Sequence, residues 1–184
     1  MKTLIKALMI GVLGISVLSS CQKDFLVDAP VPKPVAPRAS MMDYIKYNYS
    51  FSMLYAALVK TGLDKTLADT SVQYTLMAPD DAAFAATGIN ADSLDHMDVK
   101  TLTDLLSYHI LPGVFSQDAI PASLNVKYKT VNDRTLFISK QAVSNNITVN
   151  AISLRTFGST RDIGVANGMI HVLTKALKLP YRNV

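Results

Sequence analysis

The sequence of 184 residues predicts an α+β domain with its helices first and most of its strands last. Three observations carry this prediction. Apolar residues recur at helical spacing over residues 41–60 and again over 98–110. An apolar, β-branched run at 72–78 has the length and composition of a strand and ends at Pro79. Between residues 128 and 154, apolar and polar residues alternate with the period of half-buried strands.

The N-terminal residues carry the signals of export and membrane anchoring. Lysines precede an apolar stretch at residues 8–18, which is too short to span a bilayer comfortably. The sequence LSSC, residues 18–21, resembles the lipobox of bacterial lipoproteins, whose cysteine is acylated. Cys21 is the only cysteine, so the chain has no internal disulfide and no multi-cysteine zinc site. We expect a lipoprotein signal peptide at 1–20 and lipid on Cys21; an ordinary signal peptide with a chance cysteine is the alternative.

Residues 21–39 are expected to form a tether between this anchor and a single domain at residues 40–184. Four of the eight prolines fall in this segment, and proline at such density favours extended polyproline II, which would hold the domain roughly 30–50 Å from a membrane. Lys23 and Asp24 resemble the charged residues that follow the cysteine in surface-exported lipoproteins of the Bacteroidota. We therefore expect the outer membrane as the location, with the cell surface favoured over the periplasmic face.

The charge of the chain argues against a nucleic-acid partner. Without residues 1–20 the chain has 16 basic and 14 acidic residues, and no dense lysine or arginine block remains. Every acidic residue is an aspartate, which removes the usual glutamate ligand of an EF-hand and the glutamate base of zinc proteases. We expect neither a cofactor nor a metal.

The helical half begins with a capping pattern. Ser40 is followed by Asp43 three residues later, which suits the start of a helix. The apolar spacing over 41–60 predicts two short helices, because the NYS sequence at 48–50 is a weak helix interior. Gly62 provides a stop for the second helix.

Asp80 and Asp81 follow Pro79 directly, and two interpretations of this pair compete. The pair suits a helix start, with Asp80 as the N-cap and Asp81 at the positive end of the helix dipole. Adjacent carboxylates also occur in acid–base and metal sites. We favour capping, because it accounts for both carboxylates and leaves Phe84 directed toward the core.

A further helix is expected to start at Asp98 or Thr101, to include Ile110 in its apolar face and to end at Pro112-Gly113.

The C-terminal part is expected to be a meander of antiparallel strands at 128–131, 135–140 and 146–154. Asparagine and aspartate residues between these segments are typical of turns. Asn167-Gly168 predicts another turn, followed by a final strand.

Three segments resemble motif blocks of fasciclin (FAS1) domains. YTLMAPDDAAF at 74–84 resembles the first block, LLSYHILPG at 105–113 the Tyr-His block, and NGMIHVLTKAL at 167–177 the second block. They occur in the order and spacing of the family. Met77 stands where the family usually has phenylalanine, and the region 114–160 is short, which indicates a trimmed strand or loop.

This resemblance implies an antiparallel β-wedge flanked by a layer of short N-terminal helices, and extracellular adhesion or ligand binding without catalysis. Its candidate partner contacts are the Tyr108-His109 and Asp162-Ile163 pairs, which are similar to receptor-binding segments of some animal members. The second pair is expected in a loop at the domain edge. For His109 a buried structural role is favoured over partner contact, and the same holds for His171.

The remaining candidates for chemistry are weak. Asp92, Asp95, His96 and Asp98 form an oxygen-rich cluster, but the cluster lacks the loop glycine of a calcium site, and helix starts collect aspartate for electrostatic reasons. The sequence contains no nucleophile elbow and no phosphate-binding glycine loop. We therefore expect no catalytic residue.

Together these observations predict a non-catalytic FAS1 binding module that is held to a membrane by its lipid anchor. The module would capture a protein or glycan ligand or mediate cell adhesion. The alternative is a structural or accessory lipoprotein that docks to another envelope protein at the periplasmic face.

Overall fold

The computed structural model describes residues 38–144, 146–155 and 162–180. The predicted signal peptide, Cys21 and nearly all of the tether lie outside the described residues. The helices are α1 (Met41–Tyr47), the 3-10 helix η1 (Tyr49–Phe51), α2 (Ser52–Thr61), α3 (Leu63–Ala68), α4 (Asp81–Ala85), α5 (Ala91–His96) and α6 (Val99–Ser107). The strands are β1 (Tyr74–Pro79), β2 (Ile110–Pro112), β3 (Val126–Lys129), β4 (Thr135–Lys140), β5 (Ile147–Val149), β6 (Ile152–Ser153), β7 (Ile163–Val165) and β8 (Gly168–Leu173).

The first helices follow the local signals of the sequence. Ser40 Oγ accepts a hydrogen bond from the backbone N–H of Asp43 at 3.1 Å and thereby caps α1. Gly62 adopts φ 74, a left-handed conformation that suits glycine, and ends α2. The two predicted helices over residues 41–60 are confirmed. α3 is an additional helix that starts directly after Gly62.

The predicted end of the helix that contains Leu105 is wrong. Asp98 caps α6 as expected, but α6 stops at Ser107. Ile110 lies instead in β2, where it pairs with Leu76 of β1 in an antiparallel ladder. The apolar side chain of Ile110 is buried in either conformation, so its position in the sequence pattern does not distinguish a helix from a strand; pairing with β1 decides for the strand.

Sheet A has the strand order β2-β1-β8-β7. β1 pairs with β2 in an antiparallel ladder, and β7 pairs with β8 likewise. β1 and β8 are parallel, with Tyr74 opposite Gly168 and Pro79 opposite Leu173. Sheet A is therefore mixed, whereas the resemblance implied an antiparallel wedge. The predicted strand after Asn167-Gly168 is confirmed as β8.

Sheet B is the predicted meander, with the strand order β3-β4-β5-β6 and antiparallel pairing throughout. Asp133, in the turn between β3 and β4, adopts φ 64. The predicted strand at 146–154 is divided by a turn at Asn150 and Ala151, which adopt φ 48 and 65. Positive φ at both central residues is typical of tight hairpins.

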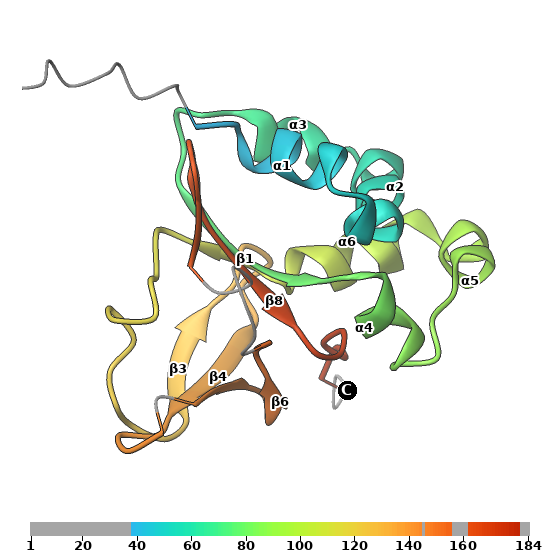
Figure 1. Cartoon of the computed structure of the whole chain (residues 1–184). Helices are drawn as coiled ribbons and strands as arrows, with labels where there is room; N and C mark the ends of the chain where they lie inside the picture. The colour runs from blue at the N-terminus through green and yellow to red at the C-terminus, as the bar shows by residue number, and fades with distance from the viewer. Residues whose placement is uncertain (1–37, 145, 156–161, 181–184) are drawn as a thin grey trace, which may run out of the picture. The chain divides into compact units, whose positions relative to one another are not determined.

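Two apolar cores lie on opposite faces of β1. Leu76 and Ala78 belong to the core between sheet A and the helices, whereas Met77 belongs to the core shared with sheet B. Successive side chains of a strand point to opposite faces, and here both faces are covered. Figure 1 shows the helices on one side of β1 and β8, and β3 and β4 on the other. The α+β class and the layer of N-terminal helices are confirmed.

Candidate functional site

Asp80 is a structural carboxylate. Its Oδ1 accepts a hydrogen bond from the backbone N–H of Ala83 at 2.7 Å, which caps α4. Its Oδ2 lies 2.9 Å from Nη2 of Arg155 in a partly buried ion pair. The capping interpretation is confirmed for this residue, and the ion pair additionally joins α4 to the segment after β6.

Asp81 lies in the first turn of α4, as predicted, and also serves a second helix. Its carboxylate accepts hydrogen bonds from the hydroxyl of Ser52 at 2.6 Å and from the backbone N–H of Met53 at 2.9 Å. The N-cap residue of α2 is Phe51, which has no side-chain acceptor. Asp81 thus supplies from a distant segment the acceptor that α2 lacks locally.

Tyr108 lies in the interior and is 2 % exposed. Its hydroxyl donates to the backbone carbonyl of Thr135 at 3.1 Å and accepts from Nδ2 of Asn150 at 2.8 Å. It therefore connects the end of α6 to β4 and to the β5–β6 turn. In this conformation the ring presents no surface to a partner.

His109 is 1 % exposed, and both ring nitrogens are engaged. Nδ1 lies 2.8 Å from the carbonyl of Leu105, and Nε2 accepts the backbone N–H of Leu177 at 2.9 Å. These partners place the ring proton on Nδ1. Burial lowers the pKa of His109 to about 4, because the charged ring would lose its hydration. The imidazole is therefore neutral near pH 7 and acts as a structural connection between α6 and the segment after β8.

The Asp162-Ile163 pair differs from the expected loop. Asp162 is exposed, adopts φ 54 and accepts the backbone N–H of Gln117 at 2.7 Å. Ile163 is half-buried, begins β7 opposite Ile170 and packs against the helix-side core. Asp162 thus reaches the surface at the sheet edge, while Ile163 belongs mainly to the fold.

His171 is a core histidine, as predicted, with 0 % exposure. Its Nε2 lies 2.7 Å from the carbonyl of Phe115. Its Nδ1 lies 3.4 Å from the backbone nitrogen of Asp162 and 3.9 Å from that carboxylate. Sequence reasoning did not foresee this contact, which connects the second motif block to the Asp162-Ile163 pair.

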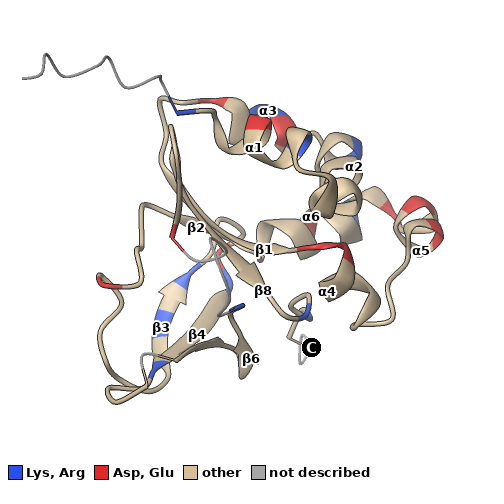
Figure 2. Ribbon diagram, in the orientation of Figure 1, with Lys and Arg blue, Asp and Glu red and all other residues tan. Residues whose placement is uncertain are grey.

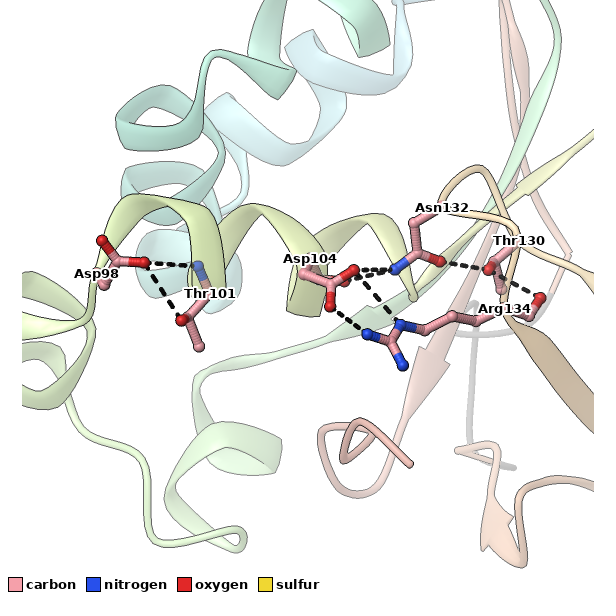
Figure 3. A network of polar contacts seen from close by, with 6 residues as sticks. All are labelled: Asp98, Thr101, Asp104, Thr130, Asn132 and Arg134. Carbon is pink, nitrogen blue, oxygen red and sulfur yellow. Dashed lines mark hydrogen bonds and ion pairs between the residues drawn. The ribbon is translucent and has the colours of Figure 1, made fainter. Parts of the chain in front are cut away.

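The acidic cluster at residues 92–98 also has structural partners. Asp98 accepts the backbone N–H of Thr101 at 3.0 Å and so caps α6 (Figure 3). Nδ1 of His96 lies 3.3 Å from Oδ1 of Asp92 within α5.

Among the residues described, no cluster of three or more histidine, cysteine or acidic side chains is arranged to hold a metal ion. In this same part of the chain, no helix has both the length and the apolar character needed to cross a membrane.

A polar network joins α6 to the β3–β4 turn, and sequence reasoning missed it (Figure 3). Nη2 of Arg134 lies 2.5 Å from Oδ2 of Asp104. Nδ2 of Asn132 donates to Oδ1 of Asp104 at 2.7 Å, and Oδ1 of Asn132 accepts from the hydroxyl of Thr130 at 2.6 Å. The Asn132-Asp133 dipeptide predicts a turn, but it holds no information about the helix that the turn meets.

An open groove of about 1060 Å³ lies beside this network. Because the network holds its side chains in place, the groove presents oriented donors and acceptors, which suit hydrogen bonding to a polar ligand. The residues that line it include Lys100, Thr103, Asp104, Ser107, Asn132 and Arg134.

Comparison with known proteins places this fold in a family. Residues 49–180, more than half of the chain, match the family described as the fasciclin domain. The chain belongs to the fasciclin domain family. The motif blocks that suggested this family therefore lie within a domain whose fold and sequence both support the assignment.

The fasciclin domain described here resembles parts of longer animal proteins. It is 30 % identical over 144 residues to transforming growth factor-beta-induced protein ig-h3 of Sus scrofa, covering 78 % of this chain and 20 % of the relative. It is 25 % identical over 138 residues to periostin of Homo sapiens, covering 75 % of this chain and 16 % of that protein. The chain thus spans about a fifth of the length of these relatives.

The fold of this fasciclin domain is similar to a solved structure of a FAS1 domain pair from the insect cell adhesion molecule Fasciclin I. The TM-score is 0.63 with 17 % sequence identity, over 78 % of this chain and 52 % of that one. At this identity the likeness establishes a shared fold.

Proposed function

We propose that this chain is a non-catalytic binding module, anchored in the outer membrane by lipid on Cys21 and displayed at the cell surface. There it captures a protein or glycan and so mediates adhesion. One observation carries the non-catalytic part of the proposal: the side chains that the sequence marks as candidates for chemistry are engaged within the fold. Asp80 and Asp81 hold helix ends, and His109 bonds two backbone segments in the interior.

Membership in the fasciclin family supports the binding role. Fasciclin I, which shares the fold, is a cell adhesion molecule, and we extend this role to the present domain. Adhesion requires exposed side chains on a rigid scaffold, and no reacting group has to be activated. The engagement of the candidate catalytic side chains within the fold is compatible with such a scaffold.

We extend the proposal to the predicted partner contacts. Asp162 is the exposed member of this set, and its carboxylate lies at the edge of sheet A beside β7. Ile163 fixes this edge of sheet A in place by packing against the helix-side core. Tyr108 and His109 contribute by holding sheet B and the C-terminal segment in place.

Protease treatment of intact cells tests the anchor and the location. The wild-type domain should be digested from whole cells, whereas Cys21→Ala should lose acylation and appear in the soluble fraction. Protection of the wild-type domain until the outer membrane is broken would contradict surface display. That result would favour the alternative, an accessory lipoprotein docked to another envelope protein, which cross-linking in intact envelopes would then identify.

Binding of intact cells to immobilised matrix proteins and glycans tests the capture role. Asp162→Asn should lower binding, because it removes a charge at the proposed contact. The matched control is Asp133→Asn, since Asp133 is also exposed and also adopts a positive φ, 64 against 54 for Asp162. Asparagine tolerates this conformation at both positions. Equal binding by wild type and Asp162→Asn would exclude Asp162 as a contact, and absence of any binding by surface-displayed wild type would contradict the capture role.

A further inference from the structure

Charge is separated within the described domain. Residues 38–109, which include the helices, carry five basic and nine acidic side chains, whereas the described residues from 110 to 180 carry seven basic and three acidic ones. Figure 2 shows acidic residues gathered on α5 and basic residues on β3, at opposite ends of the domain. Opposite charges at opposite ends steer a second copy into a head-to-tail approach.

The basic end carries an exposed aromatic ring. Lys127 of β3 lies opposite Phe137 of β4 in the antiparallel register, and Phe137 is 41 % exposed. Because side chains alternate along a strand, Lys129 shares this outer face of sheet B. Lys129 lies 3.7 Å from Asp133, so Lys127 supplies most of the net charge. We call Lys127, Lys129 and Phe137 the sheet surface.

An apolar groove of about 550 Å³ lies between α2 and α5 at the acidic end. Val59, on its wall, is 47 % exposed and therefore accessible to an incoming ring. Asp95 lines the groove, and Asp92 is exposed one turn away on α5. We call this site the helix groove; its lining includes Met53, Tyr55, Val59, Lys60, Leu94 and Asp95.

Lys60, the cation among the described residues that line the helix groove, has its ammonium engaged within the fold. The ammonium of Lys60 donates to the backbone carbonyls of Leu94, Asp95 and Met97, at the C-terminal end of α5. A cation at this end of a helix is favoured by the helix dipole. The carboxylates of Asp92 and Asp95 thus give the rim of the groove its negative charge.

We propose that a second copy of this chain docks head to tail, with Phe137 of one copy in the helix groove of the next. Lys127 and Lys129 then face Asp92 and Asp95. Burial of the ring supplies the apolar contribution, and the charged rim orients the two copies. Because the two surfaces differ, each added copy leaves one free sheet surface and one free helix groove, so copies add in a row that ends only where a ring closes.

Sedimentation analysis of the full chain carrying Cys21→Ser tests this proposal without requiring the lipid anchor or a ligand. The chain should form a concentration-dependent series of dimers and larger species. Association should weaken several-fold between about 0.05 and 0.3 M salt, because exposed charges are screened. A chain that stays monomeric at every concentration would overturn the proposal.

Two variants, each altering one surface, test the head-to-tail geometry. Lys127→Ser with Phe137→Ser alters the sheet surface, and Val59→Lys blocks the helix groove. Each variant alone should lose association by roughly tenfold or more. An equal mixture should form dimers and nothing larger, because it contains one intact sheet surface and one intact helix groove. A mixture that stays monomeric would overturn the proposal, as would either variant that still assembles alone.

A matched control removes one lysine and one aromatic ring that lie outside both the sheet surface and the helix groove. Lys46→Ser with Tyr49→Ser takes away an exposed aromatic side chain, 90 % exposed, from the α1–η1 region. This variant should assemble like the parent chain, and loss of assembly would indicate non-specific association and overturn the proposal. Circular dichroism tests whether each variant retains the fold. If Val59→Lys does not fold, Asp95→Lys replaces it, because Asp95 lies at the rim of the same groove.

Discussion

Asp81 caps α2 from 28 residues further along the chain: its carboxylate accepts the backbone N–H of Met53 at 2.9 Å. The hydroxyl of Ser52 donates to the same carboxylate at 2.6 Å. Because Asp81 also lies in the first turn of α4, one negative charge sits near the positive ends of two helices.

Replacement of Asp81 by alanine is expected to lower the free energy of unfolding by about 1–2 kcal/mol, because it removes the acceptor of two donors. Asp81→Asn retains one acceptor oxygen and should lower the free energy of unfolding by less. Urea denaturation measures both. The control is Asp95→Ala, an exposed carboxylate in α5, which should change stability by no more than about 0.5 kcal/mol. Similar losses for Asp81→Ala and Asp95→Ala would contradict the capping role.

Stability should fall as the pH decreases through the range in which His109 would be protonated in the unfolded chain. The pKa of His109 is about 4 in the folded protein, against about 6.5 in an unfolded chain. Between these values the unfolded chain binds more protons, so this contribution is fully present above pH ~6.5 and is lost toward pH ~4. The total loss is about 3 kcal/mol.

The matched variant is His109→Gln, whose amide keeps hydrogen-bonding capacity in the same cavity and does not titrate. Unfolding free energies of both proteins should be measured by urea denaturation across this pH range. The difference between them should shrink as the pH falls, because only the wild type loses the histidine contribution. Two parallel stability curves would show that His109 is not buried in its neutral form.

Asn167 bonds three backbone groups from a fully buried position. Its Oδ1 accepts the N–H of Met41 at 2.7 Å, and its Nδ2 donates to the carbonyls of Leu67 and Asp69 at 2.8 and 3.0 Å. Asn167→Ala should cost about 2–4 kcal/mol, because it leaves buried groups without partners. Asn90→Ala, which removes an exposed cap of α5, should cost about 1 kcal/mol. Thermal melting distinguishes the two, and equal shifts would count against the buried role.

Gly168 and Gly164 lie in adjacent strands and should respond very differently to alanine. A Cβ at Gly168 would lie 1.8 Å from the carbonyl oxygen of Tyr74, and Gly168 adopts φ 140. A Cβ at Gly164 would lie 2.6 Å from Nη1 of Arg38, the end of a flexible side chain that can move. Gly168→Ala should therefore cost more than about 3 kcal/mol, and Gly164→Ala less than about 1 kcal/mol. Similar urea midpoints for the two variants would refute this difference.

The elements that were predicted correctly depend on interactions within a few residues. Ser40, Asp80 and Asp98 each accept a backbone N–H three residues later, and Gly62 ends α2 through its own conformation. The alternation in β3 and β4 reflects one buried and one exposed face, which any strand in that position would show.

The candidate site was harder to predict, because its contacts join distant segments. Asp104 contacts Asn132 and Arg134, which lie 28 and 30 residues further along the chain. Each of these polar side chains could pair with many others. The Asp162-Ile163 pair was expected in a loop, but pairing of Ile163 with Ile170 makes it part of β7. Polar residues reveal that they require partners, but they do not reveal which ones.

The sequence by itself determined the starts of α1, α4 and α6 and the antiparallel meander, because side-chain capping and strand alternation are local properties. Its three motif blocks also indicated the family. Only the tertiary structure decided that β1 and β8 run parallel, that Ile110 joins β2 and that Asp81 caps α2. Each of these outcomes satisfies backbone groups or buries side chains with residues far away in the chain. The sequence contains those groups, but only the packed fold brings them within hydrogen-bonding distance of each other.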